Sequence, residues 1–160
     1  MYSGVFALLW GLGAFLYGIN IMSEKTERAF GNRLKIILGK TARGKYSSVI
    51  TGTAVTAFLQ SSSAVTVLLV SMVESGAVSL FQSVGIIMGS NIGTTVTSLL
   101  IAFDFSAFAP FFIASGAFVK LFAKKETFSC MGDVFFGFGL LFLGMEAMSG
   151  AFSSVKDNPV

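Results

Sequence analysis

The 160-residue sequence has no histidine, a single cysteine at position 130, and little charge of either sign. The absence of histidine removes the side chain that most often serves as a general base. A lone cysteine excludes an internal disulfide. Charged residues make up 12% of the chain, whereas a typical soluble domain carries about 25%. With 54% hydrophobic residues, this composition predicts a membrane protein rather than a soluble domain.

Several long segments are almost free of charge, which sets the expected number of membrane crossings. Residues 1–23, 46–73 and 75–103 form three such segments, and 105–119 and 134–152 are shorter. A membrane helix needs about 20 mostly apolar residues. The sequence therefore predicts an all-α polytopic membrane protein with about four transmembrane helices. The first segment lacks a small-residue cleavage site, so it is interpreted as a retained helix rather than a signal peptide.

The basic residues are concentrated in two places along the chain. Seven of the eleven Lys and Arg residues lie between Lys25 and Lys45, and three more lie in 120–125. Cytoplasmic segments of membrane proteins carry an excess of such residues, so both basic segments are expected on the cytoplasmic face of a plasma or bacterial inner membrane. The expected partner of these basic segments is the lipid bilayer rather than nucleic acid.

Segment 24–45 is basic, yet apolar residues such as Phe30, Leu34 and Leu38 recur in it at helical spacing. This pattern indicates a flat amphipathic helix at the membrane surface, with an ordinary charged loop as the alternative.

The segment 46–73 is better interpreted as a re-entrant helical hairpin than as a full crossing. A full crossing would place the two basic segments on opposite sides, against the positive-inside rule. The half-segment 46–59 would also make a helix of only about 21 Å, shorter than a hydrocarbon core of about 30 Å. The tip of the hairpin would carry four adjacent polar side chains at membrane depth: Gln60, Ser61, Ser62 and Ser63.

A second group of polar residues and glycines interrupts the apolar segment 80–103. Gly89, Ser90, Asn91 and Gly93 predict a broken helix, with Thr94 and Thr95 adding hydroxyl groups. In a broken helix, free N–H groups suit an anion and free C=O groups suit Na⁺. The alternative is that the glycines pack against another helix and the hydroxyls bond to the preceding turn.

An internal repeat links the two ends of the sequence. "WGLGAFLYGINIMS" (10–23) and "FGFGLLFLGMEAMS" (136–149) share five identities at a constant offset of 126 residues. One period contains three crossings, namely the first helix, the broken helix and the next helix, so the second copy is expected to be inverted. We therefore predict a first repeat over 1–128 and the opening helix of a second, truncated repeat over 129–160. The first would comprise a helix at about 4–23, the flat helix 24–45, the hairpin 46–73, the broken helix 80–103 and a helix at 106–122.

The motifs "TAFLQSSSAVTVLL" (56–69), "IIMGSNIGTTVTSLL" (86–100) and "GFGLLFLGMEAMS" (137–149) resemble the type II sodium-dependent phosphate cotransporter family. The resemblance implies two inverted repeats, each with a QSSS hairpin, and Na⁺-coupled uptake of inorganic phosphate by alternating access. Na⁺ would be the coupling ion, and no enzymatic activity is expected. The residues implied to line the phosphate and Na⁺ sites are Gln60, Ser61, Ser62, Ser63, Asn91, Thr94 and Thr95, with Thr56 and Ser90 as weaker candidates.

Other interpretations stay open at this point. Because only one complete repeat is present, the missing half would come from a second repeat or another protomer, or the chain would be a non-transporting membrane subunit or fragment. Without the resemblance, another small oxyanion would fit the residues as well as phosphate. An intramembrane serine hydrolase would need a general base near Ser61–Ser63, and neither His nor Lys lies near them. Glu146 is expected near an outer interface rather than in a proton relay.

Overall fold

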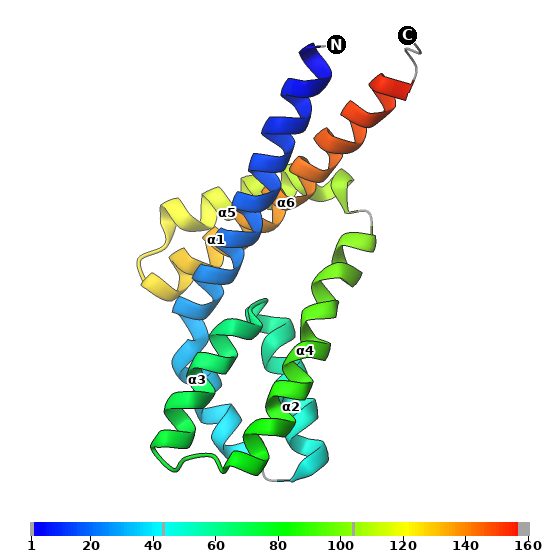
Figure 1. Cartoon of the computed structure of the whole chain (residues 1–160). Helices are drawn as coiled ribbons and strands as arrows, with labels where there is room; N and C mark the ends of the chain where they lie inside the picture. Colours follow the sequence, from blue (N-terminus) through cyan, green and yellow to red (C-terminus); the bar gives the residue numbers. More distant parts are fainter. Residues whose placement is uncertain (1, 43, 104, 157–160) are drawn as a thin grey trace. The chain divides into compact units, whose positions relative to one another are not determined.

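The computed structural model describes residues 2–42, 44–103 and 105–156, and every regular element among them is helical (Figure 1). Two of the helices are long and apolar enough to cross a membrane, over Gly4–Thr41 and Glu126–Phe152. Shorter apolar helices cover Ser62–Glu74 and Ser106–Phe122. The elements in chain order are α1 (Tyr2–Thr41), α2 (Lys45–Leu59), α3 (Ser62–Glu74), α4 (Leu80–Ala102), η1 (Ser106–Phe108), α5 (Ala109–Phe122) and α6 (Glu126–Lys156).

The described chain divides into two compact units. The terminal unit comprises residues 2–25 and 105–156, and the central unit comprises Thr26–Phe103 without residue 43. Helix α1 contributes its first part to the terminal unit and its second part to the central unit.

In the terminal unit, α1 and α6 run in opposite directions (Figure 1). They touch through glycines. A Cβ atom added to Gly18 would lie 2.5 Å from the carbonyl oxygen of Gly137, and one added to Gly144 would lie 2.5 Å from that of Gly11. Small residues let helix backbones approach this closely in membrane proteins. Four of the six glycines shared by the two sequence copies, Gly11, Gly18, Gly137 and Gly144, are therefore contact partners in space.

The α1–α6 contact is also reciprocal. The next backbone neighbour of Gly18 is Leu141, and that of Gly144 is Phe15, which stands 126 residues before Leu141. Exchanging the two copies thus maps the contact onto itself. This is the pattern of a two-fold, isologous interface.

Helix α5 packs along α6 in the same unit. Glycine again allows the approach, because a Cβ on Gly132 would lie 2.8 Å from the carbonyl oxygen of Gly116. Further along, Gly139 faces Ile113 of α5. Nζ of Lys120 forms an ion pair with Oδ1 of the buried Asp133 at 2.6 Å, which neutralises that carboxylate. Edge-to-face ring contacts also join Phe112 to Phe138, Phe138 to Phe142, and Phe142 to Phe105.

In the central unit, α2 and α4 lie against each other along a stripe of glycines. Gly85 faces Ser48, Gly89 faces Val49 and Thr53, and Gly93 faces Thr53 and Thr56. The residue numbers rise together on both helices, so α2 and α4 are parallel. Helix α3 lies between them in sequence and returns in the opposite direction, so α4 starts at the end of the unit where α2 also starts (Figure 1).

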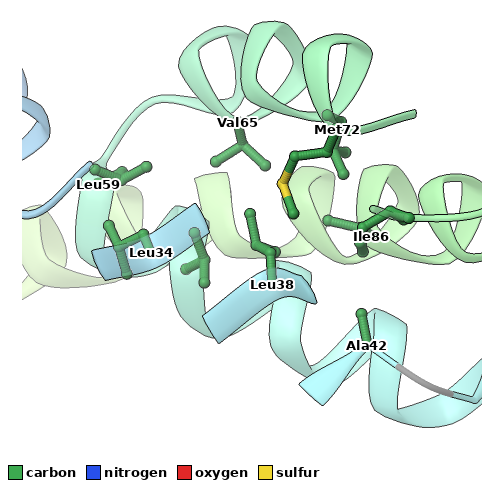
Figure 2. Close-up of a cluster of buried hydrophobic side chains, with 10 residues drawn as sticks. Leu34, Leu38, Ala42, Leu59, Val65, Met72 and Ile86 are labelled. Carbon is green, nitrogen blue, oxygen red and sulfur yellow. The ribbon is translucent and has the colours of Figure 1, made fainter. Parts of the chain in front are cut away.

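The apolar core of the central unit joins four helices (Figure 2). Leu34 and Leu38 from α1, with Ala42 just beyond its end, meet Val55 and Leu59 from α2. The same cluster includes Val65, Leu69 and Met72 from α3, Val78 from the connection, and Ile86 from α4.

Two expectations about the helices need correction. Segment 24–41 is helical, which excludes the charged loop, but it continues the first helix without a break, and its Leu34 and Leu38 are buried against protein. The helix over 80–103 is confirmed as α4, but the break expected at 89–97 is wrong because α4 is one continuous α-helix. Its glycines contact α2 rather than interrupt the helix.

Candidate functional site

The turn between α2 and α3 is made of only two residues, Gln60 and Ser61. Gln60 ends α2 in the left-handed conformation, with φ of 58°. Its backbone N–H donates to the carbonyl oxygen of Thr56 at 2.7 Å, and its Nε2 donates to the carbonyl oxygen of Ala57. Glycine is the residue that usually occupies this position, because other residues pay about 1–2 kcal/mol there. Because glutamine occupies this position despite the conformational cost, we infer that its side-chain amide has a function.

Ser61 begins α3 as its N-cap residue. Its Oγ accepts a hydrogen bond from the backbone N–H of Ala64 at 3.2 Å and lies 3.2 Å from Oγ of Ser63. The first N–H groups of a helix have no intrahelical acceptor. At this turn they belong to Ser62 and Ser63, and no hydrogen bond from either N–H group is found among the described residues. The partly exposed start of α3 therefore presents N–H and hydroxyl donors together.

The electrostatics of the turn come from helix ends rather than from charged side chains. The carbonyl end of α2 carries partial negative charge, and the N–H end of α3 carries partial positive charge. They meet within two residues. No Lys, Arg, Asp or Glu occurs between Tyr46 and Val73. Such a turn offers donors to an anion and carbonyl oxygens to a small cation within a short distance.

The two weaker candidates form a buried pair between α2 and α4. Oγ1 of Thr56 donates to Oγ of Ser90 at 2.8 Å, and both residues are at most 1% exposed. Next to them, Oγ1 of Thr53 donates to the carbonyl oxygen of Gly89 at 3.0 Å. These bonds fix the C-terminal end of α2, and with it the turn, against the middle of α4.

The remaining candidates lie on α4 and are exposed within their unit. Asn91 stands two residues beyond Gly89, which places it on the side of α4 away from α2. Oγ1 of Thr94 donates to the carbonyl oxygen of Ser90 and Oγ1 of Thr95 to that of Ile92, so both hydroxyls bond to the preceding turn. Among the described residues, no hydrogen bond joins Ser61, Ser62 or Ser63 to these α4 residues.

One feature of this region, the conformation of Gln60, was not predicted from the sequence, and another, the α2–α4 contact, was considered only as the alternative use of the glycines. No pattern in the neighbouring sequence indicates that Gln60 adopts the left-handed conformation, because glycine rather than glutamine is the usual residue in that conformation. The α2–α4 contact does have such a pattern: Gly85, Gly89 and Gly93 repeat at intervals of four residues, the small-xxx-small pattern of closely packed membrane helices.

The residues that the structure describes form helices only, two of them long and apolar enough to cross a membrane, and polar donors lie at the turn between two shorter helices. These features fit a helical membrane protein. The family described as Na⁺/Pi-cotransporter matches the chain over residues 14–150. The chain belongs to this family. It is a transporter family rather than an enzyme family.

Curated relatives come from bacteria and mammals. The chain is 30% identical over 148 residues to the "Putative inorganic phosphate export protein YjbB" of Escherichia coli K12, which covers 92% of this chain and 27% of the relative. It is 37% identical over 95 residues to the "Sodium-dependent phosphate transport protein 2A" of Mus musculus, covering 56% of this chain and 15% of the relative. The chain thus spans about a quarter, or less, of the length of these relatives. No solved structure matches the chain.

Proposed function

We propose that the chain is one repeat of a phosphate transporter, coupled to Na⁺ and working by alternating access. The α2–α3 turn would form half of its anion site. The observation that carries this proposal is the junction of two helix ends at Gln60 and Ser61, where amide, hydroxyl and N–H donors gather without any charged side chain. Ser62 and Ser63 would donate to phosphate oxygens, and the carbonyl end of α2 would lie next to Na⁺.

The roles on α4 are divided in this proposal. Asn91, Thr94 and Thr95 would face the transport path from the side of α4 away from α2. Thr56 and Ser90 would act indirectly, because their buried hydrogen bond holds the turn against α4.

We also propose that α2 and α3 form a re-entrant hairpin. Helix α2 has 15 residues and α3 has 13, so they are about 22 and 20 Å long, shorter than a hydrocarbon core of about 30 Å. The parallel course of α2 and α4 supports the same topology, because α4 then enters from the side on which the hairpin began. The basic segments 25–45 and 120–125 would both be cytoplasmic.

The second half of the site would come from an inverted repeat, on a longer chain or on another protomer. The reciprocal contact of Gly11, Gly18, Gly137 and Gly144 supports a two-fold axis between α1 and α6. The same two-fold axis predicts that Gly13 and Gly139 have equivalent surroundings. Gly139 is covered by α5, whereas a Cβ on its repeat mate Gly13 would have no neighbour within 4 Å. The helix of the second repeat that corresponds to α5 would cover Gly13.

Transport assays test the proposal directly. Labelled phosphate uptake into vesicles should require Na⁺ and should be lost in Gln60→Ala and Ser62→Ala. Ser71→Ala is a matched control, because Ser71 is an exposed serine of α3 away from the turn. Uptake that is indifferent to Na⁺ would contradict the coupling. If this chain transports nothing alone, the same substitutions belong in a form carrying both repeats.

Phosphate export is the second candidate function. It is favoured by the bacterial relative that matches over 92% of this chain and is named for export. Efflux from phosphate-loaded vesicles of known orientation distinguishes the two directions. Net efflux against an inward Na⁺ gradient would support export, and Na⁺-driven accumulation would support uptake.

A further inference from the structure

A cleft at the link between α5 and α6 has no role in the proposed transport path. Its volume is about 430 Å³, within the range of small-molecule sites. The lining consists of five apolar residues and two lysines: Phe118, Val119, Phe122, Ala123, Lys124, Lys125 and Phe128. The rings of Phe118 and Phe122 lie 4.5 Å apart and form one wall. Phe118, Phe122 and Phe128 are each more than half exposed, so a ligand can reach this wall from outside the protein.

The charge of this cleft is positive. Lys124 and Lys125 are exposed, and neither forms an ion pair with the described residues. The nearby Asp133 is already paired with Lys120 and does not oppose them. The end charges of α5 and α6 are of opposite sign at this link, so they largely cancel. The two lysines therefore decide the sign, with Glu126 as the one adjacent acid.

We propose that the α5–α6 link cleft binds an anionic phospholipid. The acyl chains would lie along Phe118, Phe122 and Phe128, and the headgroup phosphate would lie between Lys124 and Lys125. Apolar walls with a basic rim, between helices of a membrane protein, match this ligand on both counts. A water-soluble anion would not use the aromatic wall, and a zwitterionic lipid would gain little from the lysines.

A photo-crosslinking experiment on the full chain tests this site. The probes are phosphatidylglycerol and phosphatidylcholine, each with the same photoreactive acyl chain, added to the purified protein in detergent. Phosphatidylglycerol should label residues 118–128 in a saturable way, and phosphatidylcholine should label them weakly. In Lys124→Ala/Lys125→Ala, the affinity for phosphatidylglycerol should fall about 30-fold, which corresponds to about 1 kcal/mol per lysine.

The matched control is Arg33→Ala/Lys40→Ala, which removes two exposed positive charges elsewhere and should leave the labelling of residues 118–128 unchanged. Circular dichroism checks that both variants keep their helices. Equal labelling by the two lipids would show that the cleft contacts lipids without selecting the anionic one, and would overturn the proposal. An equal loss in both double variants would show diffuse surface charge and overturn it as well. Displacement by soluble glycerol phosphate would identify a free anion as the ligand instead.

Discussion

Replacing Gly18 by alanine tests the α1–α6 contact most sharply. The added Cβ would lie 2.5 Å from the carbonyl oxygen of Gly137 and 2.7 Å from the backbone nitrogen of Leu141. Both obstacles are backbone atoms, so no side-chain rotation can relieve the clash. To restore an ordinary contact of 3.4 Å, the two helices must separate by about 0.9 Å.

The expected cost follows from this separation. Overpacking in a close-packed interior costs about 1–3 kcal/mol, and the better helix propensity of alanine returns at most about 1 kcal/mol. We therefore expect a net loss of about 1–2 kcal/mol in the free energy of unfolding. For a chain of this length, that lowers the melting temperature by about 3–6 °C. Because the contact is reciprocal, Gly144→Ala should cost the same.

The assay is thermal unfolding in detergent, followed by circular dichroism and by fluorescence. The single tryptophan, Trp10, lies next to Gly11 on α1, is half exposed, and supplies the fluorescence signal. Gly13→Ala is the matched control on the same helix, since its Cβ would have no neighbour within 4 Å. It should be neutral or slightly stabilising. Equal melting of Gly18→Ala and Gly13→Ala would refute the packing, and a large difference between Gly18→Ala and Gly144→Ala would refute the two-fold relation.

Three further substitutions probe the central unit. Gln60→Gly should change the unfolding free energy by less than about 1 kcal/mol, because relief of the left-handed conformation offsets the flexibility of glycine and the lost hydrogen bond. It should still abolish phosphate transport, and full transport would contradict a role for the amide. Thr56→Val should cost about 1 kcal/mol by leaving Oγ of Ser90 without this partner, and a double-mutant cycle with Ser90→Ala that shows no coupling would contradict the pair. Ser48→Ala should be neutral or stabilising in thermal unfolding, because the buried Oγ of Ser48 has no hydrogen-bond partner among the described residues; a loss above about 1 kcal/mol would reveal one.

The helical character of the chain was predictable from composition, because long uncharged apolar segments leave helices as the simplest way to satisfy the backbone. The position of the α2–α3 turn was also predictable. Gln60 and the serines after it interrupt the apolar pattern, and the turn lies there. The helix at 80–103 was placed to within a residue from the uncharged apolar segment 75–103, and in the structure Ser79 and Gln82 form a capping box at its start.

The break expected in α4 shows where pattern alone failed. Gly89 and Gly93 have two possible uses, to open a helix or to let a second helix approach, and both produce the same letters. The choice depends on α2, whose Thr53 and Thr56 contact this stripe. The flat surface helix predicted for segment 24–41 was wrong for a similar reason. Its apolar stripe fits a lipid surface and a protein core equally well.

By itself, the sequence determined the class of protein, the helices and the polar turn, because these depend on local composition and spacing. It also showed the five identities at a constant offset of 126 residues, because such identities need no coordinates. Only the tertiary structure decided what the glycines do. Whether Gly18 meets solvent, lipid or Gly137 depends on a backbone far away in the chain, and no local pattern encodes that partner. The same holds for Thr56 and Ser90, whose hydroxyls became a buried pair only when α2 and α4 came together.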